Sequence, residues 1–292
     1  MQFKGAFSAL ITPFKDSQID EKKYRDFIEW QIEQGIDGLV PCGTTGESAT
    51  LDHSEHKKAI SICVDQSKGR VPVIAGAGSN ATSEAIDLVR HAKESGADAA
   101  LMITPYYNKP TQEGVVAHFK AISREVSIPM LVYNVPGRTS LNVLPETMAR
   151  LFSEVGDVIG TKEASADLKQ VSEIIEYAGK DFCVLSGDDF TVLPLLSIGG
   201  HGVISVVSNI VPFMMSEMCS AFEKADYGRA RELHYKMAPL CRAMFLETNP
   251  IPVKTAVHLM GKCPLEFRLP LVEMSGNNAR LLKQILQEHG LL

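Results

Sequence analysis

The chain has 292 residues, enough for one large domain or two small ones with a sizeable buried core. Hydrophobic residues make up 45% and charged residues 22%, an ordinary globular balance, and no stretch reaches the apolar length that a membrane span needs. The net charge of −6, with no basic cluster to offset it, argues against a nucleic-acid partner.

The N-terminus and the cysteines bear on location. The first five residues lack a basic region followed by a long apolar core, so no signal peptide is expected. The six cysteines are scattered, without the paired spacing of a zinc knuckle or a redox motif. Reduced and mostly packed thiols fit this pattern, and we expect a cytoplasmic protein.

Short apolar strands alternate with helical patterns as far as residue 205. A glycine-capped helix end, a tight turn and an apolar strand recur at 33–40, 94–101 and 198–204. Strands are predicted near 7–11, 38–41, 72–75, 99–103, 130–134, 157–161, 183–186 and 202–205. Helices are predicted between them, near 20–34, 53–67, 81–94, 112–125, 145–153, 167–178 and 189–197.

This alternation predicts an α/β fold, a (β/α)8 TIM barrel. A doubly wound sheet is the alternative, although it would more often show a linker and a second domain. The chain after Pro212 has helical patterns only, including an apolar stripe at Ala230, Leu233 and Met237. We therefore expect a barrel over residues 1–224 and a C-terminal helical extension over 225–292.

Lys162 follows the apolar residues Val158 and Ile159 at the end of the sixth predicted strand. A lysine on a buried strand is disfavoured because its charge loses water, and burial favours the neutral, nucleophilic amine. Such an amine can attack a carbonyl and form a Schiff base. The alternative is a structural lysine at the strand end that reaches water and pairs with Glu163.

Other polar residues follow the predicted strands, at the end of a barrel where functional groups gather. They are found in Gly43-Thr44-Thr45-Gly46-Glu47, Tyr106-Tyr107, Tyr133-Asn134-Val135-Pro136-Gly137-Arg138-Thr139 and Gly187-Asp188-Asp189. The glycine-rich loop either caps the next helix or exposes N–H groups that hold a carboxylate. The inventory lacks a cluster of histidine and carboxylate, so it favours carbonyl chemistry, and no metal site is expected.

Residues 43–47, 133–139 and Lys162-Glu163-Ala164 together resemble the pyruvate-dependent Schiff-base aldolases of the N-acetylneuraminate lyase superfamily, and the resemblance covers the whole chain. The Gly-Thr-Thr-Gly-Glu loop, Tyr107 and Arg138 are similar to the branch that condenses pyruvate with L-aspartate 4-semialdehyde. The resemblance implies a lyase without a cofactor that makes 4-hydroxy-tetrahydrodipicolinate, the first committed step of diaminopimelate and lysine biosynthesis. The alternatives are a sister aldolase for sugar acids (N-acetylneuraminate lyase or keto-deoxy-sugar acid aldolase) and a non-catalytic binding protein.

The resemblance also implies roles for individual residues. Lys162 would form the imine with pyruvate and Tyr133 would shuttle protons, while Thr44 and Tyr107 would relay protons to water, with Tyr107 reaching in from a neighbouring subunit. Substrate would be bound by Thr45, Arg138, Gly187 and Ile204. The assembly implied is a homotetramer, a dimer of dimers.

Feedback inhibition by lysine is implied by a further set of matching positions. These are Ser48, Ala49, His53, His56, Asn80, Glu84 and Tyr106. The spacing of the two histidines, and of Asn80 and Glu84, predicts that each pair shares a helix face. Glu84 offers a negative charge for an ammonium group, and Asn80 offers a donor for a carboxylate.

Overall fold

The computed structural model describes residues 3–292, so Met1 and Gln2, which the signal-peptide prediction included, lie outside it. The chain forms two compact units. The first unit joins the segment that ends at Gly5 to Val73–Ile204, and the second unit joins Ala6–Pro72 to Ser205–Leu292. The predicted boundary at residue 224 is a different division, and it stays a prediction.

Eight parallel strands form one sheet in the order β4-β1-β10-β9-β8-β7-β6-β5. Their bounds are β1 Gly5–Ala9, β4 Gly38–Val40, β5 Ile74–Gly76, β6 Ala99–Ile103, β7 Met130–Asn134, β8 Val158–Glu163, β9 Cys183–Ser186 and β10 Gly202–Ser205. All eight agree with the predicted strands to within a few residues. With helices alternating between the strands, this is the predicted TIM barrel, which is thereby confirmed.

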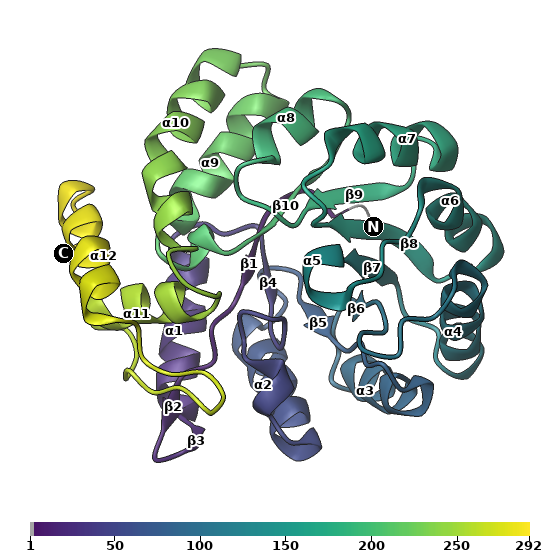
Figure 1. The fold of residues 1–292 in the computed structure, drawn as a ribbon, viewed down its shortest axis with the longest axis horizontal. Helices are drawn as coiled ribbons and strands as arrows, with labels where there is room; N and C mark the ends of the chain where they lie inside the picture. The colour runs from purple at the N-terminus through teal and green to yellow at the C-terminus, as the bar shows by residue number, and fades with distance from the viewer. Residues whose placement is uncertain (1–2) are drawn as a thin grey trace. The chain divides into compact units, whose positions relative to one another are not determined.

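In the first unit, helices cover the outer face of the strands, as Figure 1 shows for α3, α4, α6 and α7. The helices are α3 Thr82–Glu94, α4 Gln112–Glu125, α5 Pro136–Thr139, α6 Pro145–Glu154, α7 Leu168–Ala178 and α8 Val192–Ser197. Apolar side chains of both layers, among them Val132, Phe119, Leu151 and Ile174, are buried in one cluster. Burial of this cluster is what holds the helices onto the sheet.

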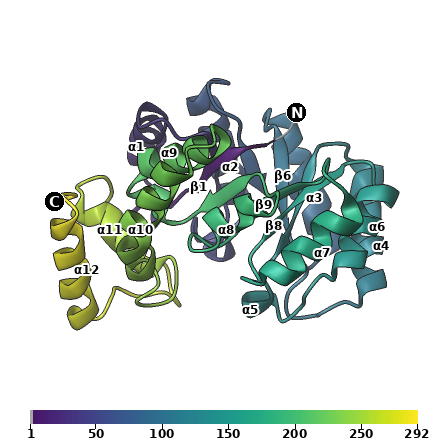
Figure 2. The ribbon, with the colours of Figure 1, turned by 90° about the horizontal axis from the view of Figure 1, so that it is seen from above.

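The second unit contains the helices of the predicted C-terminal extension. Its helices are α1 Glu21–Glu33, α2 His53–Ser67, α9 Pro212–Glu223, α10 Tyr227–Ala243, α11 Ile251–Leu259 and α12 Gly276–Glu288. Figure 2 shows α12 beside α10 and α11. The stripe of Ala230, Leu233 and Met237 on α10 is buried, as its spacing predicts. Of the described residues, no helix is long and apolar enough to cross a membrane.

Several short elements were not predicted. They are the two-residue strands β2 Phe14–Lys15 and β3 Gln18–Ile19, the one-turn helix α5 and the 3-10 helices Ser48–Thr50 and Val207–Asn209. None is long enough to show a period of its own in the sequence. The 3-10 helix Ser48–Thr50 matters most, because it directly follows the glycine-rich loop.

All six cysteines are buried and free of disulfides, as predicted for packed thiols. Burial raises the pKa of the Cys183 and Cys263 thiols to about 12. Burial also raises the pKa of Cys42, Cys63 and Cys219 well above its usual range. These side chains therefore act as small apolar groups in the core.

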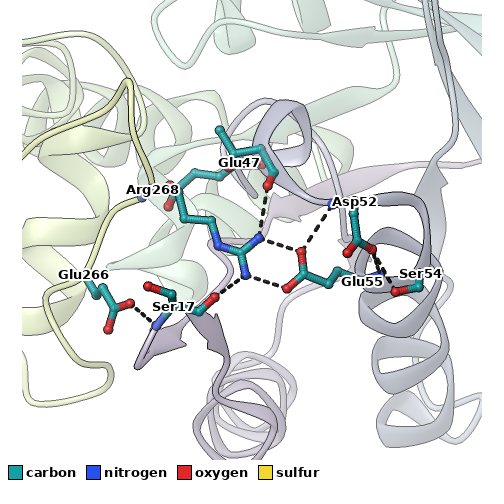
Figure 3. A network of polar contacts seen from close by, with 8 residues as sticks. Ser17, Glu47, Asp52, Ser54, Glu55, Glu266 and Arg268 are labelled. Carbon is teal, nitrogen blue, oxygen red and sulfur yellow. Dashed lines mark hydrogen bonds and ion pairs between the residues drawn. The ribbon is translucent and has the colours of Figure 1, made fainter.

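Helix α2 begins at a reciprocal cap and is tied to the C-terminal part of the chain (Figure 3). The Asp52 carboxylate accepts from the Glu55 N–H, and the Glu55 carboxylate accepts from the Asp52 N–H. The Arg268 guanidinium donates to both Glu55 oxygens at 2.6 and 2.5 Å, and to the Ser17 carbonyl at 2.6 Å. A forked pair of this kind fixes direction as well as distance.

A buried ion pair joins the end of the glycine-rich loop to helix α11. The Lys254 ammonium donates to a Glu47 oxygen at 2.5 Å, and both side chains are 0% exposed. Lys254 also lies over the Phe14 ring, 4.0 Å from its centroid. Glu47 has a left-handed backbone (φ 56), which is uncommon for a residue other than glycine, so the loop conformation sets the direction of its side chain. The ion pair therefore anchors the last residue of the glycine-rich loop to helix α11.

Breaking this pair should destabilise the protein. Lys254→Met leaves the Glu47 carboxylate buried without its cation, and we expect the free energy of unfolding to fall by about 3–5 kcal/mol. The double variant Lys254→Met/Glu47→Gln removes both charges and should recover part of this loss. Urea unfolding measures both, with Lys22→Met, which breaks the exposed pair with Asp26, as a control expected to change little. An unchanged Lys254→Met would contradict the prediction.

Candidate active site

Lys162 and Tyr133 lie side by side at the carboxyl ends of adjacent strands. β7 and β8 are parallel, and their register pairs Tyr133 with Lys162 and Asn134 with Glu163. The Lys162 Nζ lies 4.2 Å from the centroid of the Tyr133 ring. Both residues are buried, and Lys162 is only 6% exposed. The pattern of a lysine at the end of a buried strand therefore led to an amine that is largely withdrawn from water.

The alternative that pairs Lys162 with Glu163 is not what the structure contains. Successive side chains of a strand point to opposite faces, so the two residues diverge. The Glu163 carboxylate accepts instead from Asn134 Nδ2 at 2.9 Å and from the Ser165 N–H at 2.8 Å. Within residues 3–292, Lys162 has no ion-pair partner. Its amine is thus available for chemistry.

A second buried lysine provides a comparison. Lys254 is held by Glu47 and its charge is balanced, whereas Lys162 lies over the Tyr133 ring and has no ion-pair partner among the described residues. The pKa of Lys254 is lowered by burial, with the Glu47 charge opposing the shift. A paired ammonium is a poor nucleophile, because its lone pair carries a proton that the carboxylate stabilises. Of the two, Lys162 is the candidate nucleophile.

Gly187 and Ile204 lie at the ends of the two strands that follow β8. The Gly187 N–H donates to the Glu163 carbonyl at 2.7 Å, which brings the chain after β9 close to the end of β8. A Cβ at Gly187 would stand 2.5 Å from the Ala164 Cβ, so a side chain has no room there. Ile204 on β10 is fully buried. Any contact that Gly187 makes with a substrate is a backbone contact.

Arg138 is carried by the short helix α5, directly after β7. Its side chain is exposed, whereas the neighbouring Thr139 is buried and its hydroxyl bonds the Val135 and Leu141 carbonyls. The guanidinium therefore stands at the surface of a segment whose own backbone is well anchored. An anchored arginine of this kind is suited to clamping a carboxylate with two hydrogen bonds.

The glycine-rich loop belongs to the second unit. Thr45 is buried and its Oγ1 accepts from Asn249 Nδ2 at 3.1 Å, while Thr44 is half-buried. The Thr12 hydroxyl donates to the Gly46 carbonyl at 2.7 Å. A Cβ at Gly46 would lie 3.1 Å from the Leu10 carbonyl, which explains the glycine. The loop is a tight, multiply anchored turn, as its composition predicts.

The tyrosine pair behaves differently from Tyr133. Tyr107 is 91% exposed and has a left-handed backbone (φ 68), and Tyr106 is exposed as well. The Tyr106 carbonyl accepts from Asn80 Nδ2 at 3.2 Å and from the Asn108 N–H at 2.8 Å. These contacts hold the loop so that the Tyr107 ring points away from the chain that carries it. In the single chain the Tyr107 ring is therefore open to solvent.

The seven candidate lysine-binding residues are divided between the units. Ser48, Ala49, His53 and His56 belong to the second unit, and Asn80, Glu84 and Tyr106 to the first. The histidines both lie on α2, as predicted, with His56 buried and His53 exposed. The prediction that Asn80 and Glu84 share a helix face is wrong, because α3 begins at Thr82 and Asn80 lies in the preceding loop.

Two further groups of polar residues had no role assigned from the sequence. One is the buried cluster around Asn134 and Glu163, and the other is Asn249 with Lys254. Lys254 could have been noticed as a charged residue within the otherwise apolar helix α11. Nothing in the sequence near Asn134 indicates its partners. In the described part of the chain, no group of three histidine, cysteine or acidic residues is arranged to hold a metal ion.

Comparisons with known proteins agree on one family. Residues 2–289 match the model of the dihydrodipicolinate synthetase family. The 4-hydroxy-tetrahydrodipicolinate synthases of Nitratidesulfovibrio vulgaris (strain DP4) and Oleidesulfovibrio alaskensis are 64% and 65% identical over 292 residues, which is 100% of this chain. The first of these is also covered over 100% of its own length. A crystal structure of a dihydrodipicolinate synthase, 51% identical, superposes with a TM-score of 0.97 and covers 99% of this chain and all of its own.

Three further solved structures bear on ligands and assembly. The dihydrodipicolinate synthase of Acinetobacter baumannii was solved in complex with pyruvate (42% identity, TM-score 0.96), and that of Cyanidioschyzon merolae with lysine bound (38%, 0.96). A third is a monomeric variant of such a synthase (45%, 0.97). Each covers at least 98% of its own length. A match of this extent, in sequence and in structure, shows that the chain belongs to the dihydrodipicolinate synthetase family.

Proposed function

We propose that the chain is a 4-hydroxy-tetrahydrodipicolinate synthase, a lyase that condenses pyruvate with L-aspartate 4-semialdehyde. The observation that carries the proposal is the buried amine of Lys162 beside the Tyr133 ring. The relatives that are 64–65% identical are 4-hydroxy-tetrahydrodipicolinate synthases, which supports this activity over that of a sugar-acid aldolase. This reaction is the first committed step of lysine biosynthesis.

Lys162 attacks the keto carbon of pyruvate, and loss of one water gives a protonated imine. This imine withdraws electrons from the adjacent methyl group, which loses a proton to become an enamine. The enamine carbon forms the new bond to the aldehyde of the second substrate. The amino group of that substrate then displaces Lys162 and closes the ring. The first step needs an amine that no carboxylate holds as an ammonium, and Lys162 has no ion-pair partner among the described residues.

Tyr133 moves the protons in this sequence. Its ring lies beside the Lys162 amine, and we assign to its hydroxyl the proton that leaves with the hydroxyl of the carbinolamine. A phenol has an ordinary pKa of about 10, so it needs hydrogen-bonded neighbours to exchange protons at pH 7. By family resemblance, Thr44 and Tyr107 are the neighbours that relay protons between Tyr133 and water, and Tyr107 comes from a second copy of the chain. Its 91% exposure in one copy supports that assignment.

Substrate carboxylates are bound by two different devices. Thr45 and the amides of its loop hold the carboxylate of pyruvate, and Arg138 holds that of the semialdehyde. Gly187 and Ile204 line the reacting end through backbone atoms. A tetramer in the cytoplasm is the assembly and location that we favour, and one solved relative is a monomeric variant.

Reduction by borohydride in the presence of pyruvate tests the nucleophile. One pyruvate-derived adduct is expected, on Lys162, because its amine is buried without a carboxylate partner. Lys162→Ala should abolish trapping, whereas Lys169→Ala, which removes an exposed lysine of α7, should not. Peptide mapping by mass spectrometry locates the adduct. An adduct on Lys254 would overturn the assignment.

Arg138→Ala separates the two substrates. The KM for the semialdehyde should rise about 10–100-fold, because hydrogen bonds to charged groups are worth roughly 1.5–3 kcal/mol. Trapping of pyruvate should be nearly unchanged, since only the second substrate needs the guanidinium. Steady-state kinetics and trapping are compared with Arg124→Ala, an exposed arginine of α4. Equal damage to both steps would mean that Arg138 is structural.

Lysine is proposed to inhibit the enzyme at a site separate from that of pyruvate. The relative from Cyanidioschyzon merolae with lysine bound supports this, together with the match of seven residues. Glu84 lies in the first turn of α3 and accepts from the Ser79 hydroxyl at 2.7 Å, so its carboxylate has a fixed place. Tyr106 adjoins Tyr107, and a ligand that orders one tyrosine therefore affects the other.

Turnover measured against lysine concentration tests the regulation. Partial, saturable inhibition is expected in the wild type, since typical coupling energies are about 1–3 kcal/mol. Glu84→Ala should lose most of this sensitivity, because it removes the charge that faces the ammonium group. Glu94→Ala, at the other end of the same helix, is the matched control. Simple competition with pyruvate, or a wild type insensitive to millimolar lysine, would refute the proposal.

A further inference from the structure

Asn134 and Glu163 are the residues that directly follow Tyr133 and Lys162 along β7 and β8. The same register that pairs the tyrosine with the lysine pairs the asparagine with the glutamate. Because side chains alternate along a strand, this second pair points away from the first, toward the covering helices. Asn134 is fully buried and Glu163 is 2% exposed. The chemistry described above uses neither of them.

The hydrogen bonds of Asn134 give its amide one orientation. Its Nδ2 donates to the Glu163 carboxylate at 2.9 and 3.2 Å, and to Asn142 Oδ1 at 2.8 Å. Its Oδ1 accepts from the Val143 N–H at 3.0 Å. A reversed amide would place its oxygen against the Glu163 carboxylate and Asn142 Oδ1, and its N–H groups against the Val143 N–H. The carboxylate therefore determines which way the amide faces.

Glu163 is surrounded by neutral donors. Besides Asn134, the Ser165 N–H donates to it at 2.8 Å and Gln170 Nε2 at 3.3 Å. Gln170 on α7 in turn bonds Asn142 in both directions, at 2.7 and 3.1 Å. Burial raises the pKa of Glu163, and the bonds from Ser165 and Asn134 oppose that rise. The side chains of Asn134, Glu163, Asn142 and Gln170 thus form one hydrogen-bonded network. The Glu163 carboxylate only accepts hydrogen bonds in it, whereas the three amides both donate and accept.

This network closes the segment that carries Arg138. The segment 135–143 leaves β7 directly after Asn134 and returns to the Asn134 side chain at Val143. Helix α5, with Arg138, lies between these two points. Gln112 of α4 adds a second hold, since its Nε2 donates to the Asn142 carbonyl at 2.8 Å. The position of α5 relative to the Lys162 strand therefore depends on an amide that Glu163 orients.

We propose that Glu163 and Asn134 are positioning residues that set Arg138 for the carboxylate of the second substrate. The carboxylate orients the amide, and the amide fixes the return of the 135–143 segment and with it α5. The inference rests on the proposed function, because it assumes that Arg138 binds the semialdehyde. It adds a determinant of second-substrate binding that itself touches neither substrate.

Glu163→Gln tests this, because glutamine keeps the size of the side chain and turns one acceptor into a donor. The KM for the semialdehyde should rise about tenfold, while the KM for pyruvate and its trapping on Lys162 stay within about twofold. The effect should vanish in the Arg138→Ala background, since a residue that acts through Arg138 cannot act without it. The double variant Glu163→Gln/Asn134→Asp reverses donor and acceptor and should restore part of the KM.

Two further variants complete the test. Asn142→Ala removes a partly exposed member of the network, so it is expected to fold even if Glu163→Gln does not, and should raise the semialdehyde KM about threefold. Thr161→Val is the matched control: it removes a buried hydrogen bond to the Val132 carbonyl on the same face of β8, without touching the 135–143 segment. It should leave the ratio of the two KM values unchanged.

The outcomes separate this inference from the proposed function. Trapping of pyruvate and the effect of Arg138→Ala in the wild-type background test the function alone. With both as expected, a normal semialdehyde KM in Glu163→Gln and Asn142→Ala would overturn the positioning role. So would additive effects of Glu163→Gln and Arg138→Ala, or a loss of turnover in proportion to the unfolded fraction with both KM values unchanged.

Discussion

The register between β7 and β8 is the constraint on which the candidate site depends. Parallel pairing sets Tyr133 beside Lys162, and the alternation of side chains then sends the next residue of each strand to the other face. A slip by one residue would place Glu163 where the amine now lies. The same register therefore places the Tyr133 phenol beside the Lys162 amine and the Glu163 carboxylate on the opposite face of the sheet. There the carboxylate joins the polar network with Asn134.

The contrast between the two buried lysines sets Lys162 apart as the candidate nucleophile. Both are buried, but Lys254 forms an ion pair with Glu47, whereas Lys162 lies over the Tyr133 ring without an ion-pair partner among the described residues. Burial by itself is thus a poor indicator of function. What distinguishes the catalytic candidate is a buried amine without an opposite charge beside it, which costs stability and is typical of functional sites.

The fold could be predicted well because its signals are local. Strands such as 99–103 and 130–134 are apolar runs, and helices such as 53–67 carry caps and a period, so each is visible in its own residues. Helix α5 has a single turn and could not show a period. Asn80 was placed on a helix because spacing does not reveal where α3 begins.

Contacts between distant residues could not be predicted in the same way. The site residues were found through motif resemblance and through their position after strands. The partners of Glu163 and Glu47 are 29 and 207 residues away, at Asn134 and Lys254, and no pattern in one sequence relates them. Such pairs depend on how the strands and helices assemble. For the same reason, the contacts of Asn134 with Glu163 and of Lys254 with Glu47 were not predicted from the sequence.

The buried cysteines have a practical consequence. Because all six thiols are buried, alkylating reagents have little to attack on the folded chain. A cysteine introduced at an exposed position, such as that of Tyr107 in the single chain, would then be the one fast-reacting thiol. A fluorophore placed there could report on whether that ring position becomes covered as copies of the chain associate. Because the six native cysteines are buried, a label can be attached at one introduced cysteine without first replacing them.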